Sequence, residues 1–229
     1  MPSEALLEVR DLRIQLTGGR EILRGASIEI SSGAIVGLFG DSGCGKSTLA
    51  LSLLGLLPPQ RYRVHGEILF GGQDLLNFSE PALAAVRGVQ ISMIFQDPLL
   101  ALNPVLRIRT QLTEILRAHR ASADPAELLS LAGLAAPGRI LDSYPHQLSG
   151  GERQRVTIAQ AIACRPSLVV ADEPFTALDA PRVVDLIALF RDLRTKTGTS
   201  FLLISHHRGV LAAAADKILR LQDGVLHVN

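Results

Sequence analysis

The sequence predicts an α/β fold built around a mostly parallel sheet. Three short apolar runs are typical of strands that are buried on both faces of such a sheet, and they lie at residues 34–39, 168–171 and 201–204. Helical patterns that supply the covering layers lie at about 46–57, 181–196 and 208–215. Each apolar run ends at polar residues, and in open α/β sheets ligands bind beyond the carboxyl ends of the strands. We therefore expect the three strand ends to converge on one site.

The composition allows one substantial core with a small subdomain, because 47% of the 229 residues are hydrophobic. The 23 basic and 22 acidic residues leave a net charge of +1, so no nucleic-acid partner is expected. Two cysteines are too few for a disulfide framework, and residues 1–4 have neither the basic region nor the apolar core of an export signal. We therefore expect a cytoplasmic protein. The longest apolar stretches, at 49–57 and 210–215, are shorter than the roughly 20 residues of a membrane span, so a membrane role requires another chain.

A glycine-rich segment follows the first apolar run and fits the pattern G-x-x-x-x-G-K-[ST]. It consists of Gly40, Asp41, Ser42, Gly43, Cys44, Gly45, Lys46, Ser47 and Thr48. In such a loop, backbone N–H groups point at phosphate oxygens, Lys46 reaches the β- and γ-phosphates, and Ser47 ligates Mg²⁺. The alternative is a glycine-rich turn that matches by chance. A buried strand before it and a helix after it favour the phosphate site.

The second apolar run ends at Asp172, Glu173 and Pro174. An acid at the end of a buried strand is costly unless it serves a cation, so Asp172 is expected to hold Mg²⁺ through its water shell. Glu173 can then orient and deprotonate an attacking water. Pro174 disfavours the helical conformation for Glu173, which predicts an extended segment there. Taken alone, the pair is equally consistent with two solvated loop acids.

The third run ends at Ser205, His206 and His207. His206 could merely be solvated or cap the next helix. Because its strand belongs beside the other two, we expect His206 to contact the γ-phosphate and to hold the water and Glu173 in line.

Residues 148–154, with the sequence Leu-Ser-Gly-Gly-Glu-Arg-Gln, precede an amphipathic run at 155–163. Ser149 and Glu152 have the spacing of a capping box. Gly150 and Gly151 lie in the first helical turn, where each costs up to about 1 kcal/mol relative to alanine, so something is expected to approach that backbone closely. A helix N-terminus is an anion site, and the phosphate loop already occupies one end of the nucleotide. We therefore expect Ser149, Gly150 and Gly151 to meet the γ-phosphate held by a second protomer.

These motifs together resemble those of the ATP-binding cassette (ABC) ATPases. Residues 40–47 resemble the Walker A loop, 168–172 the Walker B strand, 148–154 the signature motif and 176–179 the D-loop, and His206 resembles the switch histidine. Gln96, within 94–98, resembles the Q-loop glutamine, which in the family touches the Mg²⁺ and lytic-water region. The resemblance also implies that Asp179 contributes to nucleotide binding.

The family implies a P-loop NTPase core with an N-terminal antiparallel β part and a helical subdomain. On this basis, residues 1–229 form one ATPase domain, with the core at about 1–98 and 165–229 and the helical subdomain at about 99–164. That subdomain docks on membrane subunits in the family. The resemblance therefore implies an enzyme that binds ATP and Mg²⁺ and hydrolyses ATP.

Within the family, residues 95–104 and 144–152 look most like dipeptide, oligopeptide and nickel importers. This implies a subunit that is peripheral on the inner face of the cell membrane. Its partners would be a second ATPase subunit, identical or paralogous, integral membrane permease subunits and, indirectly, a substrate-binding protein.

Three departures from the family pattern are visible. Glu152 stands where glutamine is commonest, and His207 replaces a frequent acid. Residues 13–20 lack the aromatic that usually stacks on adenine, which leaves Leu16 in its place and predicts modest discrimination between ATP and GTP.

Two other functions are weighed against the importer. The first is a soluble ABC-type ATPase that acts as a switch or assembly subunit, for example in phosphonate degradation. The second is a P-loop GTPase or small-molecule kinase, which shares only the phosphate loop and does not explain the glycines at 150 and 151.

Overall fold

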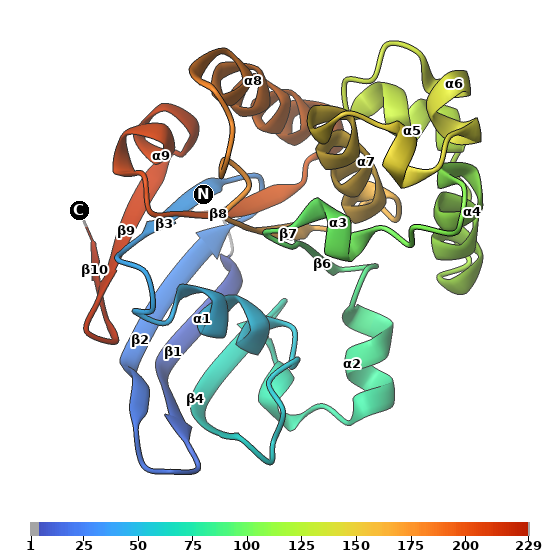
Figure 1. The fold of residues 1–229 in the computed structure, drawn as a ribbon. Coiled ribbons are helices and arrows are strands. Elements are labelled where there is room, and N and C mark those ends of the chain that lie inside the picture. Colours follow the sequence, from blue (N-terminus) through green and yellow to red (C-terminus); the bar gives the residue numbers. More distant parts are fainter. Residues whose placement is uncertain (1–4, 229) are drawn as a thin grey trace.

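A computed structural model describes residues 5–228. Residues 1–4, where the sequence shows no export signal, and Asn229 lie outside the described residues. A six-stranded sheet with the order β10-β9-β3-β8-β7-β6 forms the centre (Figure 1). Its strands are β3 (Ile35–Phe39), β6 (Ile91–Ile94), β7 (Leu168–Asp172), β8 (Ser200–Ser205), β9 (Lys217–Gln222) and β10 (Val225–Val228). Every neighbouring pair is parallel except β9 and β10, which confirms the predicted mostly parallel sheet.

The three strands predicted from apolar runs are neighbours, with β8 between β3 and β7. Their side chains alternate between two hydrophobic cores, because successive residues of a strand point to opposite faces. Val169 and Leu203 belong to one core, whereas Val170 and Leu202 belong to the other. Burial on both faces explains why these strands are continuously apolar.

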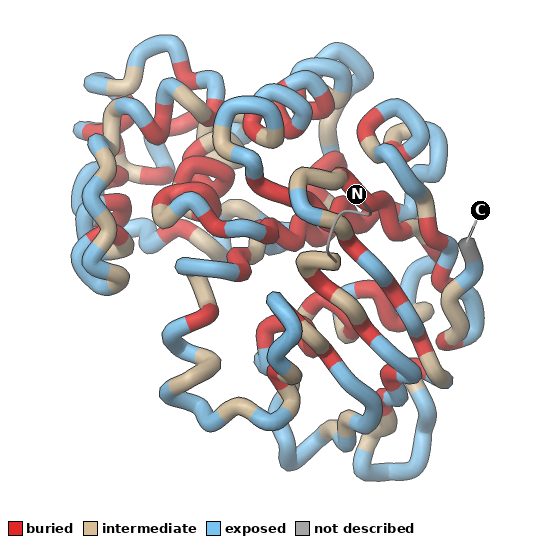
Figure 2. The backbone as a smooth tube through the Cα atoms, turned by 180° about the vertical axis from the view of Figure 1, so that it is seen from behind, coloured by how far each residue is buried: buried red, intermediate tan, exposed pale blue. Residues whose placement is uncertain are grey.

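A second, antiparallel sheet lies against one of these cores and has the order β2-β1-β4-β5. Its strands are β1 (Ala5–Leu16), β2 (Glu21–Ser31), β4 (Tyr62–Phe70) and β5 (Gln73–Asp74). Figure 2 shows them banded in red and pale blue, since only one face is buried. The pairing of β1 shifts register between Val9 and Leu12, where Asp11 has φ of +42°, and both apolar side chains therefore reach the same core.

Some of the helices pack against the central sheet, and others lie beyond its end. Helices α1 (Lys46–Leu53) and α2 (Glu80–Val86) follow the first strands, and α8 (Ala180–Thr197) and α9 (Arg208–Ala214) follow the later ones. The helices between β6 and β7 are α3 (Pro98–Ala101), α4 (Ile108–Ala118), α5 (Pro125–Leu131), α6 (Pro137–Asp142) and α7 (Gly150–Ile162). Short 3₁₀ turns occur at Leu75–Asn77 and Pro145–Gln147. In Figure 1, α4 to α7 gather at one end of the molecule, from green to yellow. The division of the chain into a core and a helical subdomain at 99–164 remains a prediction.

One predicted helix is shorter than expected. The pattern at 46–57 forms a helix only to Leu53, because Gly55 has φ of +60°, a left-handed conformation that ends the helix. The patterns at 181–196 and 208–215 correspond to α8 and α9 within one residue at each end. Within residues 5–228, no helix is long and apolar enough to cross a bilayer.

Candidate active site

The glycine-rich loop joins β3 to α1. Gly45 has φ of +110°, and a Cβ there would lie 3.0 Å from the side chain of Ile22, so only glycine fits this position. Lys46 is buried, and its ammonium group donates hydrogen bonds to the carbonyl oxygens of Gly40 (2.8 Å) and Asp41 (3.0 Å). The loop is thus folded around the lysine that the sequence predicts to bind phosphate.

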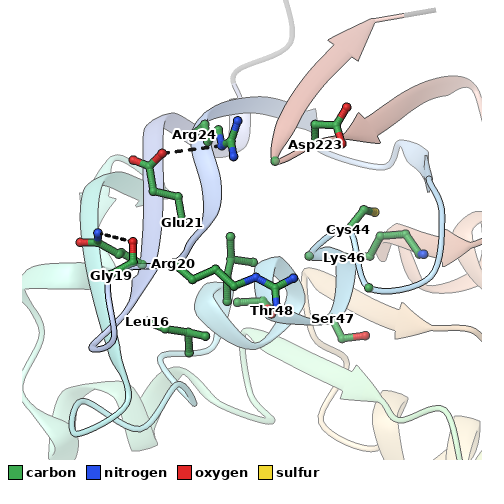
Figure 3. Close-up of a pocket in the computed structure, with 15 residues that line it drawn as sticks. Leu16, Gly19, Arg20, Glu21, Arg24, Cys44, Lys46, Ser47, Thr48 and Asp223 are labelled. Carbon is green, nitrogen blue, oxygen red and sulfur yellow. Dashed lines mark hydrogen bonds and ion pairs between the residues drawn. The ribbon is translucent and has the colours of Figure 1, made fainter.

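A cleft of about 1040 Å³ opens beside this loop (Figure 3). Residues 43–48 of the loop line one side of the cleft, whereas Asp41 and Ser42 are exposed outside its lining. Leu16, on the β1–β2 hairpin, lines another side, as the sequence predicts. The sequence did not predict the other eight lining residues, which are Gln15, Gly19, Arg20, Glu21, Ile22, Arg24, Asp223 and Gly224. No local motif marks them, because the fold alone brings the β1–β2 hairpin and the β9–β10 turn to the loop.

Asp172 ends β7 and is buried beside Ser47. Within the described residues, its Oδ1 atom is buried without a hydrogen-bond partner. Burial raises the pKa of Asp172 above its ordinary value, and a hydrogen bond with the Ser47 side chain opposes this rise. A buried carboxylate oxygen that lacks a partner and lies near a hydroxyl suits a hard cation that prefers oxygen ligands. The residues present therefore fit Mg²⁺.

Gln96 lies two residues after the end of β6 and is exposed. It lines a second cleft, of about 800 Å³, together with Ser47 and Asp172. The structure thus brings the three residues predicted to hold Mg²⁺ to one cleft. Their roles as ligands remain predictions.

Glu173 and His206 contact each other at the ends of the neighbouring strands β7 and β8. The Nδ1 atom of His206 lies 2.9 Å from Oε2 of Glu173, and the hydroxyl of Thr176 donates to the same oxygen at 3.2 Å. The Glu173 side chain is only 11% exposed, so its carboxylate is held rather than solvated. This arrangement argues against the alternative of two solvated loop acids.

The expected extended conformation of Glu173 is wrong. Its φ is +51°, in the left-handed region. The backbone N–H of Glu173 donates to the carbonyl of Ile204 (2.9 Å), and its own carbonyl accepts from Thr176 (3.2 Å), so the chain turns immediately after β7. Pro174 disfavours only the right-handed helical conformation of Glu173. The hydrogen bond from Glu173 to β8 then favours the left-handed conformation over an extended one. A strained backbone of this kind is common at functional sites.

The signature segment begins α7 as the sequence predicts. The N–H of Glu152 donates to the Ser149 hydroxyl at 3.2 Å, and the N–H of Ser149 donates to the Glu152 carboxylate at 2.8 Å, which completes a capping box. That second hydrogen bond lowers the pKa of Glu152, and Arg139 forms an ion pair with the same carboxylate.

The expected close approach to Gly150 and Gly151 does not occur within the described chain. A Cβ on either glycine would have no atom within 4 Å. Asp179 caps α8 by accepting from the N–H of Arg182 at 3.1 Å, and it lines neither of the two clefts described above. A single chain therefore leaves the signature glycines and Asp179 apart from the phosphate loop. Their contact with nucleotide remains a prediction.

Residues 23–176 match the family model described as ABC transporter. The chain belongs to the ABC transporter family. This ABC ATPase is 42% identical to the dipeptide transport ATP-binding protein DppD of Bacillus subtilis, over 96% of the chain and 69% of that protein. It is 42% identical to the oligopeptide transport ATP-binding protein OppD of the same organism, over 96% of the chain and 64% of OppD. The chain thus spans about two thirds of the length of these relatives.

Solved structures of ABC cassettes have the same fold. The dimeric structure of MJ0796, a bacterial ABC transporter cassette, superposes with a TM-score of 0.82 at 26% identity, over 96% of each chain. A dimeric post-hydrolysis state of MJ0796 bound to ADP and Pi has a TM-score of 0.81 at 25% identity, over 97% of this chain and 98% of that one. The predicted P-loop α/β fold and the ATPase class are therefore confirmed, and the chain is an ATP-binding ATPase of this family.

Proposed function

We propose that this ABC ATPase hydrolyses MgATP as a dimer and drives an importer through separate membrane permease subunits. The observation that carries the catalytic part is the contact of 2.9 Å between His206 and Glu173, which lies at the end of the strand that neighbours β3, the strand before the phosphate loop. It places a held carboxylate and an imidazole where three parallel strands end, which is where ligands bind in such sheets.

Each residue has a role that its position supports. Lys46 neutralises the β- and γ-phosphate oxygens, and the N–H groups of the loop surround them. Ser47, Asp172 and Gln96 would hold Mg²⁺, and the bound ion would supply positive charge near the phosphates. Glu173 orients the attacking water and accepts its proton, while His206 holds Glu173 in place and contacts the γ-phosphate.

The dimer explains the open signature glycines. The N-terminus of α7 has the positive end of a helix dipole and no side chain at residues 150 and 151, so a phosphate held by a second subunit can reach its N–H groups. Ser149 and Asp179 would contribute at the same interface. The dimeric MJ0796 structures support this arrangement.

The names of the relatives support import of peptides. DppD and OppD are transport ATP-binding proteins for dipeptides and oligopeptides, and nickel complexes remain the second cargo class that the sequence predicts. The partners would be an identical or paralogous ATPase, membrane permeases and, indirectly, a substrate-binding protein. The chain would then lie in the cytoplasm, peripheral on the inner face of the membrane.

The Glu173→Gln substitution tests the chemistry. We expect it to retain ATP binding and to lower hydrolysis by about 10² to 10⁴, the usual contribution of a general base. The trapped nucleotide should also favour the dimer in size-exclusion chromatography. Glu29→Gln, an exposed carboxylate on β2, is the matched control and should hydrolyse normally. Normal turnover by Glu173→Gln would remove Glu173 from its role.

Co-purification tests the transport role. The tagged chain, expressed in its own host and extracted in mild detergent, should bring down an integral membrane permease. Recovery only with soluble enzymes would instead support the assembly or switch function.

A further inference from the structure

The base-binding end of the first cleft has an unusual lining. With the triphosphate in the glycine-rich loop, the rest of the nucleotide must extend along the cleft toward the β1–β2 hairpin. Among the described residues that line this cleft, none is aromatic. Some other side chain must therefore cover the face of the base.

Two arginines, Arg20 and Arg24, line this end of the cleft, and they differ in whether a carboxylate forms an ion pair with them. Arg24 lies 3.6 Å from the carboxylate of Glu21. Within residues 5–228, no carboxylate forms an ion pair with Arg20. Figure 3 shows the Arg20 side chain reaching from the hairpin toward Thr48, above Leu16. Its guanidinium group is thus available to a ligand.

The hairpin holds Arg20 at a fixed place relative to Leu16. The N–H of Leu16 donates to the carbonyl of Arg20 (2.8 Å), and the N–H of Gly19 donates to the carbonyl of Leu16 (2.8 Å). The side-chain amide of Gln15 donates to the carbonyl of Gly19 at 2.9 Å. The planar cation and the apolar side chain therefore project from one closed turn into the same cleft.

We propose that Arg20 stacks its guanidinium group on the purine base of the bound nucleotide, with Leu16 packing against the base. This inference rests on the proposed nucleotide site. A guanidinium is planar, delocalised and weakly hydrated, and it stacks on π faces. Stacking recognises the π face that every base has, so Arg20 binds ATP and GTP with similar affinity.

Equilibrium binding of ATP and of inorganic tripolyphosphate separates stacking from a charge effect. Because a cation on a π face contributes modestly at exposed sites, Arg20→Ala should weaken ATP binding by about 3- to 10-fold. Tripolyphosphate has no base, so its affinity should change less than about 2-fold. Arg20→Tyr should restore ATP binding, since a ring stacks on the base without a charge. Arg10→Ala, which removes a guanidinium from the same sheet outside the cleft, should leave both affinities unchanged.

The outcomes are distinct. An equal loss of ATP and tripolyphosphate affinity in Arg20→Ala, with no recovery in Arg20→Tyr, would show that Arg20 contacts phosphate and overturn the proposal. Unchanged ATP affinity in Arg20→Ala would overturn it as well. Failure of the unsubstituted, folded chain to bind ATP would instead contradict the nucleotide site itself.

Discussion

At the scale of single residues, the buried carboxylate of Asp172 lowers the free energy of unfolding of the metal-free protein. Its carboxylate is buried, and its Oδ1 atom lacks a partner within the described residues, so the ionised form is destabilised in the absence of metal. The pKa of Asp172 is raised by burial, which means that the folded protein takes up this proton more readily than the unfolded chain does. The contribution of Asp172 to the free energy of unfolding therefore becomes less unfavourable as the pH falls toward its raised pKa.

Replacing this charge with a neutral group should raise stability and remove activity. We expect Asp172→Asn to increase the Tm of the metal-free protein, because the substitution removes a buried charge. For a domain of this size, a gain of about 1 kcal/mol in the free energy of unfolding corresponds to roughly 2–4 °C. The same variant should lose Mg²⁺-dependent ATP hydrolysis. Thermal melts in EDTA and a turnover assay measure the two effects, with Glu29→Gln as the neutral control. A lower Tm for Asp172→Asn would contradict the account of the buried charge.

Local sequence predicted the residues whose position follows from a strand end. The positions of Asp172, Glu173 and His206 at neighbouring strand ends followed from the rule that parallel strands end at one edge of a sheet, and their roles stay predictions. The left-handed conformation of Glu173 was not found, since it depends on a hydrogen bond to Ile204 on another strand. The place of Arg20 in the lining of the first cleft was not predicted either, because only the three-dimensional fold brings its hairpin to the glycine-rich loop.

At the scale of elements, α7 gives a prediction in which stability and activity move in opposite directions. Gly151 lies in the first turn with open space around a Cβ, so Gly151→Ala should stabilise the helix by up to about 1 kcal/mol. The added methyl group should nevertheless slow ATP hydrolysis, since it hinders the approach of phosphate from a second subunit. Gly151→Asp should be worse, because it adds a negative charge near the γ-phosphate.

Melting curves and turnover of the two Gly151 variants measure this difference. Gly198→Ala would be a poor control, because Gly198 has φ of +73° and caps α8. Gly18→Ala is better matched, since a Cβ there also meets open space and its φ is not in the left-handed region. A Gly151→Ala chain with the turnover of the Gly18→Ala control would show that the signature glycines do not meet phosphate.

Element types were predictable where one physical rule dominates, and element ends were predictable where a local signal sets them. The buried strands β3, β7 and β8 followed from their continuous apolar runs. The early end of α1 depends on Gly55, which adopts a left-handed conformation. Glycine can also continue a helix, so the sequence alone does not show that the helix ends there. The capping box at Ser149 was predicted correctly because its two hydrogen bonds are local.

At the scale of the whole molecule, the central question is whether two chains share each site. A chain with Lys46→Ala lacks a working phosphate loop but keeps its signature, whereas a Gly151→Asp chain has the opposite defect. Each alone should fold and fail to hydrolyse ATP. In a mixed two-fold dimer, one intact loop faces one intact signature, so an equal mixture should recover roughly a quarter of normal turnover if sites act independently.

Turnover measured against the mixing ratio, with circular dichroism to establish folding, tests whether two chains share each site. A folded Gly151→Asp chain that hydrolyses ATP normally by itself would contradict the shared site, because both signatures of its dimer carry the substitution and both would then be dispensable.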